Sequence, residues 1–278
     1  LEEIRKNHLE AVTSPEKDAE KNNPLVVWLG YGVHGNESSP GNASMLVAYY
    51  LAASQSQEVQ EVLNSSVILI DPCLNPDGFN RAATWSNMHT HKTTVSNPVD
   101  RQFREDWPGG RTNHYWFDLN RDWLPLQHPE SQARIEQFHK WKPHVLTDHH
   151  EMGSSSTFFF QPGVPERVNP LTPDRNFELT KEISEFHADA LDKIGSLYFS
   201  EEGFDDFYYG KGSTYPDVNG SIGILFEQSR VLGQVIENPH GKLSFAEAIR
   251  NHFTVSLSTI KASIKKEQEL KDYLRDFY

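Results

Sequence analysis

Leu25-Val26-Val27-Trp28-Leu29-Gly30 decides the fold class, because five apolar residues closed by a glycine are typical of a strand buried on both faces. Similar short apolar runs recur further along the chain, at residues 67–70, 144–147 and 222–226. Segments with helical features alternate with them and cover residues 1–12, 42–53, 129–141, 173–194 and 242 onward. This alternation predicts an α/β fold, a single domain over residues 1–278 with a mixed, mostly parallel central sheet flanked by helices.

The composition excludes several classes of protein. The 278 residues include 26 basic and 39 acidic side chains, and a net charge of −13 argues against nucleic acid as a partner. No apolar run approaches the roughly 18 residues that a membrane-spanning helix needs. The single cysteine, Cys73, rules out an internal disulfide framework and a cysteine-based zinc site. Any zinc site must therefore consist of histidine and carboxylate side chains.

Residues 75–127 show little periodicity and are rich in Trp, Asn, His and Arg. We predict a long loop region here, and loops of that length in a compact domain usually carry function.

The first strand leads into a pattern that resembles a nucleotide site. Gly30-Tyr31-Gly32-Val33-His34-Gly35 matches the G-x-G-x-x-G pattern that cradles a dinucleotide. However, Pro40 and Gly41 delay the helix that should receive the pyrophosphate, and the acid expected about 20 residues further on is missing. A nucleotide-binding oxidoreductase is therefore the less favoured alternative from another class of function.

The same loop holds His34 and Glu37, and a second polar group, Asp148-His149-His150-Glu151, follows the strand at 144–147. Both groups lie at the carboxyl ends of predicted strands, where open α/β sheets place their ligands. One of the two adjacent imidazoles could complete a His, Glu, His set, which leaves an open position as in catalytic zinc sites. The alternatives are a solvated loop histidine beside a capping glutamate and a surface histidine pair.

Two further motifs suit hydrolysis. Glu227 follows the last predicted strand, where a carboxylate could take a proton from a metal-activated water, or could be an ordinary strand-end acid. Asn120-Arg121 offers a fork-shaped donor that matches a carboxylate. The alternative is that Arg121 pairs with Asp118 or Asp122.

Taken in order, these motifs resemble the zinc carboxypeptidase family of the carboxypeptidase A type, in an outlying bacterial form, from about residue 25 to 260. The markers are His34-x-x-Glu37, Asn75-Pro76-Asp77-Gly78, Asn120-Arg121, Asp148-x-His150 and Phe226-Glu227. The resemblance implies a hydrolase that removes the last residue of a peptide with a free C-terminal carboxylate. It also implies an active site in loops at the carboxyl ends of the strands.

The resemblance assigns one zinc ion per chain to His34, Glu37 and His150. It selects His150 over His149, because the family's third ligand lies two residues after the aspartate. Asp148 is then expected to orient a ligand imidazole from outside the metal shell.

The resemblance also assigns the catalytic and substrate-binding roles. Glu227 corresponds to the general base, and Asn120 with Arg121 corresponds to the pair that grips the substrate's terminal carboxylate. The arginine that polarises the scissile carbonyl is assigned to Arg81, and the mobile tyrosine to Tyr209. The alternatives at these two positions are Arg101, Arg104, Tyr208 and Tyr215.

The substrate's side chain is less determined. Asp217 near the side-chain pocket would favour basic residues, and the net charge disfavours a strongly acidic substrate unless the cleft is locally basic. A deacylase or amidohydrolase acting on a small acylated amino acid or a cell-wall peptide would keep the same zinc set. Because only 33 residues precede His34, we expect N-terminal strands of the full domain to be missing, which would allow a non-catalytic binding module. Family habit favours a secreted or periplasmic location.

Overall fold

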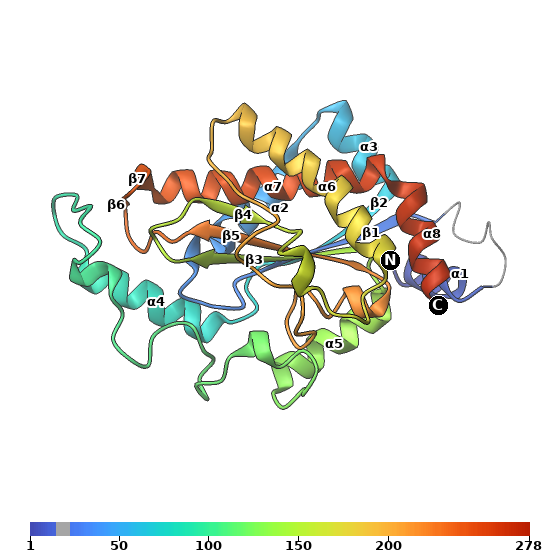
Figure 1. Cartoon of the computed structure of the whole chain (residues 1–278), viewed down its shortest axis with the longest axis horizontal. Helices are drawn as coiled ribbons and strands as arrows, with labels where there is room; N and C mark the ends of the chain where they lie inside the picture. The colour runs from blue at the N-terminus through green and yellow to red at the C-terminus, as the bar shows by residue number, and fades with distance from the viewer. Residues whose placement is uncertain (15–22) are drawn as a thin grey trace.

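A five-stranded sheet runs through the middle of the protein in the computed structural model, which describes residues 1–14 and 23–278 (Figure 1). The strand order is β2-β1-β3-β5-β4, with β1, β2, β3 and β5 parallel and β4 antiparallel to β5. The strands are β1 (Leu25–Tyr31), β2 (Ser66–Asp71), β3 (Val145–Met152), β4 (Phe158–Phe160) and β5 (Ile222–Ser229). The predicted α/β fold with a mixed, mostly parallel sheet is confirmed.

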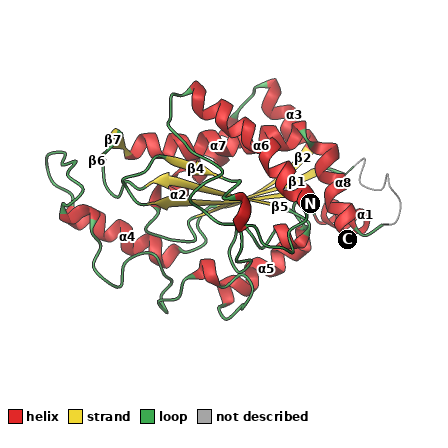
Figure 2. Cartoon of the chain, in the orientation of Figure 1, coloured by secondary structure: helices red, strands yellow, loops and turns green. Residues whose placement is uncertain are grey.

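Helices cover both faces of this sheet, as Figure 2 shows. They are α1 (Glu2–Val12), α2 (Ser38–Ala53), α3 (Gln57–Ser65), α4 (Pro76–His89), α5 (Pro129–Trp141), α6 (Asp174–Lys193), α7 (Phe245–Lys265) and α8 (Glu267–Phe277). Short pieces complete the chain: η1 (Arg101–Phe103), η2 (Leu119–Arg121), η3 (Pro165–Arg167), η4 (Asp217–Asn219) and the hairpin β6 (Val235–Asn238) and β7 (Gly241–Ser244). Within the described part of the chain, no helix has the length and apolar character needed to cross a membrane.

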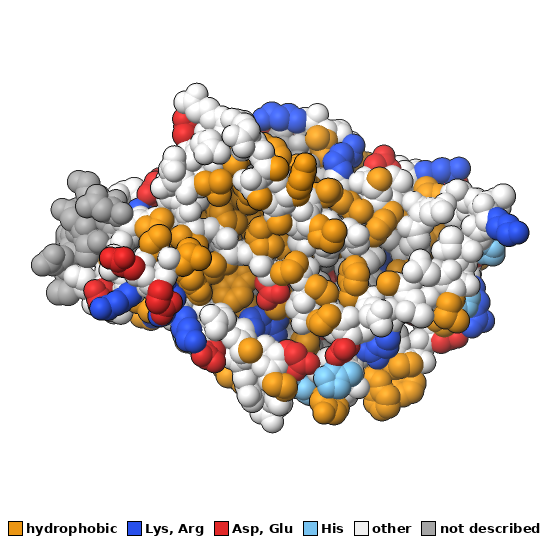
Figure 3. All heavy atoms as spheres, turned by 180° about the vertical axis from the view of Figure 1, so that it is seen from behind, with side chains coloured by type: hydrophobic (Ala, Val, Ile, Leu, Met, Phe, Trp, Pro, Cys, Tyr) orange, Lys and Arg blue, Asp and Glu red, His pale blue; other side chains and the backbone are white. Residues whose placement is uncertain are grey.

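The two faces of the sheet build two separate cores, because successive side chains of a strand point to opposite sides. The residues of β1 show this division: the side chains of Val27 and Leu29 pack in one core with Val47 of α2, and Trp28 packs in the other with Phe138 of α5. Every residue of β1 is buried, which explains its unbroken apolar run. Figure 3 shows the face opposite the viewer of Figure 1, where hydrophobic side chains gather over the middle of the surface.

The prediction of a continuous loop over residues 75–127 was wrong, because α4 occupies Pro76–His89. The side chain of Asn75 caps this helix by accepting a hydrogen bond from Gly78 N at 2.9 Å, and Pro76 occupies its first turn. Only Gly78 and Ala82 are buried in α4, so the helix has almost no apolar stripe. A helix that buries so little carries no periodic pattern for the sequence to show.

Two strands extend further than the apolar runs that predicted them. Strand β3 continues through Asp148, His149 and His150, and β5 continues through Glu227. The polar residues therefore lie within the hydrogen-bonded sheet and not in loops beyond it. Because β3 and β5 are paired in register, His150 lies directly beside Glu227.

Candidate functional site

The turn after β1 brings a histidine and a glutamate to the carboxyl end of the sheet. Gly32 opens the turn with a φ of +67°, a conformation that glycine adopts without strain. The backbone N–H of Glu37 then donates to the carbonyl of His34 at 3.2 Å, so both side chains stay close to the neighbouring strand β3. His34, Glu37 and His150 are all buried there, and their ligand atoms lie within 4.8 Å of one another.

The distances within this cluster suit a shared cation. The Nδ1 atoms of His34 and His150 are 3.1 Å apart, and each lies 2.9 Å from one carboxylate oxygen of Glu37. Ligand atoms of a tetrahedral zinc site, each roughly 2.0–2.1 Å from the ion, lie about 3.3 Å apart. Four buried ligand atoms that converge in this way fit one zinc ion, and the predicted ligand set is brought together.

The outer nitrogen of each imidazole has its own acceptor. His34 Nε2 lies 3.0 Å from Asp118 Oδ1, and His150 Nε2 lies 2.8 Å from Asp148 Oδ2. A carboxylate on the outer nitrogen fixes the ring orientation and leaves Nδ1 free to bind a metal. The structure therefore places Asp148 as expected beside His150, and it adds Asp118 as the corresponding partner of His34.

The ionisable side chains of the cluster shift one another's pKa values. Burial lowers the pKa of His34 and of His150, but the surrounding carboxylates outweigh burial and raise both values, that of His150 well above its usual range. Burial raises the pKa of Glu37, but the two imidazoles hold it well below its usual range. The metal-free cluster therefore retains protons that a metal ion would displace on binding.

Alternation along β3 separates the two adjacent histidines. His150 faces the metal cluster, while the ring of His149 stacks on Tyr31 at 4.4 Å and its Nδ1 lies 3.1 Å from His252 Nδ1. Burial holds the pKa of His149 well below its usual range. A strand's two-residue period thus gives a physical reason why only one of the pair can be a ligand.

Glu227 reaches the same site from β5. Burial raises the pKa of Glu227 to about 8; the charge of His150 opposes this shift, and that of Glu37 adds to it. The carboxylate lines a cleft of about 500 Å³ that also contains the three ligand residues. Basic side chains from separate segments line this cleft: Arg111, Arg121, Lys211 and Arg230. The same cleft is lined by as many acidic side chains, which are Glu37, Glu151, Asp205 and Glu227, so it carries both signs of charge.

The predicted carboxylate-binding pair lies at one end of the cleft. Asn120 donates through Nδ2 to Asp148 Oδ2 at 3.0 Å and accepts from Gly212 N at 2.8 Å. Arg121 donates to the carbonyl of Asn120 at 2.8 Å, and no carboxylate of the described residues pairs with it. The alternative pairing with Asp118 was wrong, because Asp118 binds Arg111 at 2.9 Å.

Arg81 does not reach the site, and its assignment as the polarising arginine is corrected. Its guanidinium donates to the carbonyls of Pro108, Thr112 and Asn113, so it holds the loop instead of lining the cleft. Arg111, in that loop, lies at the cluster, with Nη1 3.3 Å from His34 Nδ1 and 3.6 Å from Glu37 Oε1. No local pattern in the sequence marks Arg111, because this residue lies outside any periodic segment.

None of the three candidate tyrosines, Tyr209 and its alternatives Tyr208 and Tyr215, lines the cleft. Tyr215 is buried against Trp123 and Phe138. Tyr208 is the closest of the three to the binding pair, since its hydroxyl donates to the carbonyl of Arg121 at 3.2 Å.

Asp217 is buried away from the cleft, where it accepts from Gly223 N at 2.7 Å and Asn176 Nδ2 at 3.0 Å. It cannot serve a side-chain pocket.

The glycines of the apparent nucleotide motif have a packing role. A Cβ atom on Gly35 would lie 1.9 Å from the backbone nitrogen of Phe79, and one on Gly78 would lie 2.2 Å from the carbonyl oxygen of Gly110. Asn75 Nδ2 also donates to the carbonyls of Val33 and Arg111, at 3.2 Å each. The Asn75–Gly78 motif therefore joins the metal loop, which carries His34 and Glu37, to the arginine loop, which carries Arg111.

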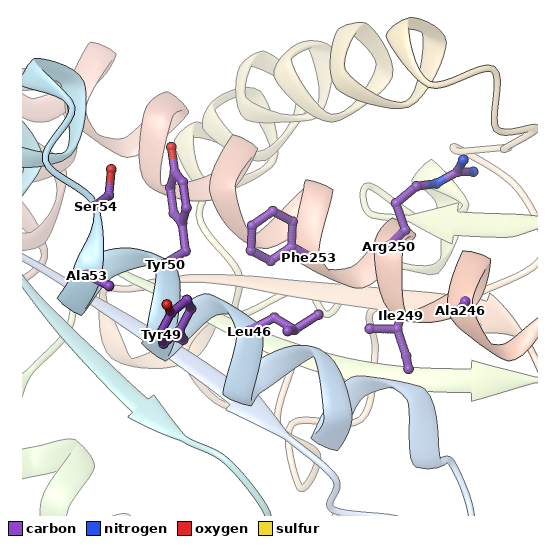
Figure 4. A pocket seen from close by; sticks show the side chains of 9 residues that line it. All are labelled: Leu46, Tyr49, Tyr50, Ala53, Ser54, Ala246, Ile249, Arg250 and Phe253. Atoms are coloured by element: carbon purple, nitrogen blue, oxygen red, sulfur yellow. The ribbon is translucent and has the colours of Figure 1, made fainter.

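A separate hollow of about 550 Å³ lies between α2 and α7 (Figure 4). Leu46, Tyr50 and Phe253 line it, and Arg250 lies at one end. It lacks the acid, base and metal ligands of the cleft, so its composition does not suit hydrolysis.

Comparison with known proteins agrees with this geometry. A sequence model of the family described as zinc carboxypeptidase matches residues 3–262. Carboxypeptidase 2 of Trichophyton rubrum is 31% identical over 134 residues, which are 48% of this chain and 20% of the relative. Carboxypeptidase E of Caenorhabditis elegans is 34% identical over 106 residues, which are 37% of this chain and 19% of the relative. The matched part thus spans about a fifth of these curated relatives.

Solved structures share the fold. A metallo-carboxypeptidase from Pseudomonas aeruginosa superposes with a TM-score of 0.62 at 17% identity, covering 87% of this chain and 58% of the other. A metallo-carboxypeptidase from Burkholderia cenocepacia also gives 0.62 at 16% identity, with coverage of 88% and 59%. At these identities the likeness establishes the architecture alone.

Proposed function

The chain belongs to the zinc carboxypeptidase family, and we propose that it hydrolyses the C-terminal peptide bond of substrates with a free carboxylate. The observation that carries this proposal is the pairing of His150 with Glu227 across β3 and β5. It puts a carboxyl group next to the buried metal ligands. The same cleft holds Arg121, which pairs with no carboxylate of the described residues. These are the parts that metal-assisted amide hydrolysis needs.

Zinc held by His34, Glu37 and His150 would supply a Lewis acid for the carbonyl oxygen and lower the pKa of a neighbouring water to about 7. Glu227 takes one proton from the attacking water and delivers it to the amine nitrogen as the C–N bond breaks. Burial raises the pKa of this carboxyl group in the metal-free protein, and the positive charge of a bound zinc ion would lower it toward the ionised form that accepts a proton.

Two arginines have different tasks in this proposal. Arg111, beside the metal ligands, stabilises negative charge as it develops on the carbonyl oxygen, a contribution typically worth about 3 kcal/mol. Arg121, with Asn120 beside it, binds the terminal carboxylate and so positions the last peptide bond at the metal. Cleavage is then restricted to the C-terminal residue.

The Glu227→Gln variant tests the proposal. We expect hydrolysis of a peptide with a free C-terminus to fall by about 100- to 10,000-fold, because the amide cannot accept the proton. Elemental analysis should still find one zinc ion per chain, since Glu227 is not a ligand. Full activity in this variant would remove Glu227 from the mechanism.

The same peptide with an amidated C-terminus is the substrate control. Wild-type protein should cleave it far more slowly, because Arg121 then has no carboxylate to bind. Equal rates on both peptides would favour the amidohydrolase alternative.

A further inference from the structure

One carboxylate outside the assigned site joins three of its segments. The side chain of Glu105 is only 6% exposed, although it lies in the irregular chain between η1 and η2. Oε1 accepts from Gly110 N at 2.9 Å, and Oε2 accepts from Asn36 Nδ2 at 2.7 Å and Arg230 Nη2 at 2.9 Å. Both oxygens are thus engaged by donors that come from different parts of the chain.

Each donor stands next to a group that the proposed function uses. Gly110 directly precedes Arg111, Asn36 lies between the ligands His34 and Glu37, and Arg230 follows Glu227 closely in the chain. Glu105 therefore connects the arginine loop, the metal loop and the end of β5. No family motif in the sequence marks it.

The backbone of the arginine loop is held partly by Glu105. Arg111 is 46% exposed, and it spans from Asp118 to the metal ligands. The backbone before it is fixed on both sides of Gly110, whose N–H donates to Glu105 and whose carbonyl accepts from Asn36 N at 3.1 Å. Without Glu105, the buried N–H of Gly110 and the guanidinium of Arg230 would both lose their acceptor.

We propose that Glu105 is a positioning residue that sets Arg111 against the metal ligands. This inference rests on the proposed function, in which Arg111 stabilises charge on the carbonyl oxygen. Glu105 itself touches no reacting atom; it acts by holding the backbone of the arginine loop against the metal loop.

The test compares Glu105→Ala and Glu105→Gln with Asp106→Asn, a neighbouring exposed acid that pairs with Arg101 on the surface. Glu105→Ala should lower kcat by about 10- to 100-fold with KM changed less than about threefold and zinc content unchanged. Glu105→Gln keeps one acceptor oxygen, which can serve either Gly110 or the pair of donors Asn36 and Arg230, and it should recover part of the loss. Asp106→Asn should behave as wild type.

A double variant decides whether the effect passes through Arg111. Once Arg111→Ala is present, adding Glu105→Ala should cost less than about twofold more in kcat. A further loss as large as that of Glu105→Ala alone, or a loss of zinc in the single variant, would overturn the proposal.

Hydrogen exchange of the metal-free protein gives a readout that does not depend on activity. Glu105→Ala should speed exchange of the Gly110 amide by about tenfold and Glu105→Gln by less, and both should leave amides in β3 unchanged. Unchanged exchange at Gly110 would overturn the positioning role. A wild-type protein that fails to cleave free peptides would instead count against the proposed function.

Discussion

Among the residues that the structure describes, two groups of histidine and carboxylate side chains have similar composition and different surroundings. Each has ligand atoms within 4.8 Å of one another; the first is His34, Glu37 and His150, and the second is Asp77, His114 and Glu130. All members of the first group are buried, whereas two members of the second are exposed. The comparison shows that residue type and spacing alone do not define a metal centre.

The difference lies in how the imidazoles are held. In the buried group each ring has a carboxylate on its outer nitrogen, which leaves Nδ1 directed at the other ligands. In the exposed group His114 uses Nδ1 itself to contact Asp77 at 2.6 Å, and about half of each side chain faces solvent. Burial also removes competing water, so the first group gains more from a shared cation.

The largest expected effect comes from removing one imidazole from each group. His150→Ala should abolish stoichiometric zinc binding and lower peptide hydrolysis by about 1,000-fold or more, since the metal contributes several kcal/mol to catalysis. His114→Ala should retain one zinc ion per chain and near wild-type activity. The measurements are elemental analysis after dialysis and steady-state kinetics; loss of zinc in His114→Ala would show that the exposed group binds metal.

A smaller effect is expected from the outer carboxylates. Asp118→Asn should weaken zinc binding by about 10- to 100-fold, because an amide holds the ring of His34 less firmly than a carboxylate does. The matched change at the exposed group, Asp77→Asn, should leave zinc affinity unchanged. Competition with a chromogenic chelator measures the zinc affinity of both variants. Equal affinities for Asp118→Asn and wild type would show that Asp118 does not strengthen the zinc site.

The smallest expected effect concerns the stability of the protein in acid. It depends on the burial of one histidine outside both groups. Burial lowers the pKa of His187, packed between Phe160 and Phe226, to about 3. Between pH 6.5 and 3 the unfolded chain therefore binds a proton that the folded chain refuses. The free energy of unfolding should fall as pH drops through this range, with His187 contributing a slope of at most about 1.4 kcal/mol per pH unit.

Urea unfolding of His187→Gln at several pH values tests this contribution. The glutamine cannot take up the proton and keeps a polar atom for Ser258, which lies 2.7 Å from the histidine. The slope below pH 6.5 should become shallower. An unaltered slope in His187→Gln would show that His187 does not contribute to the loss of stability in acid.

Much of the fold and the metal ligands could be predicted from the sequence. The apolar runs of β1, β3 and β5 depend on burial at both sheet faces, and burial leaves a clear pattern. The short spacings next to these strands predicted that His34, Glu37 and one of two adjacent imidazoles would meet at one sheet edge. The family resemblance selected His150, and the structure brings these three side chains together. Asn120 and Arg121 likewise lie in the cleft.

The residues that were missed are held by contacts between distant segments. Arg111 is positioned by Asn75, Arg81 and Glu105, and none of these contacts has a spacing that repeats along the chain. Arg81 was favoured over Arg101 and Arg104, which come later in the chain after the Asn-Pro-Asp-Gly motif. Helix α4 was also missed, because it buries only Gly78 and Ala82 and therefore has no apolar stripe that would reveal it.

The close backbone contacts of Gly35, Gly78 and Gly110 limit which side chains these positions can carry. A Cβ atom on any of the three would lie 2.5 Å or less from a backbone atom of another segment, so the metal loop, the start of α4 and the arginine loop pack backbone against backbone. A change such as Gly35→Ala would have to push these segments apart, and it would therefore disturb the loop of the metal ligands and the segments packed against it together.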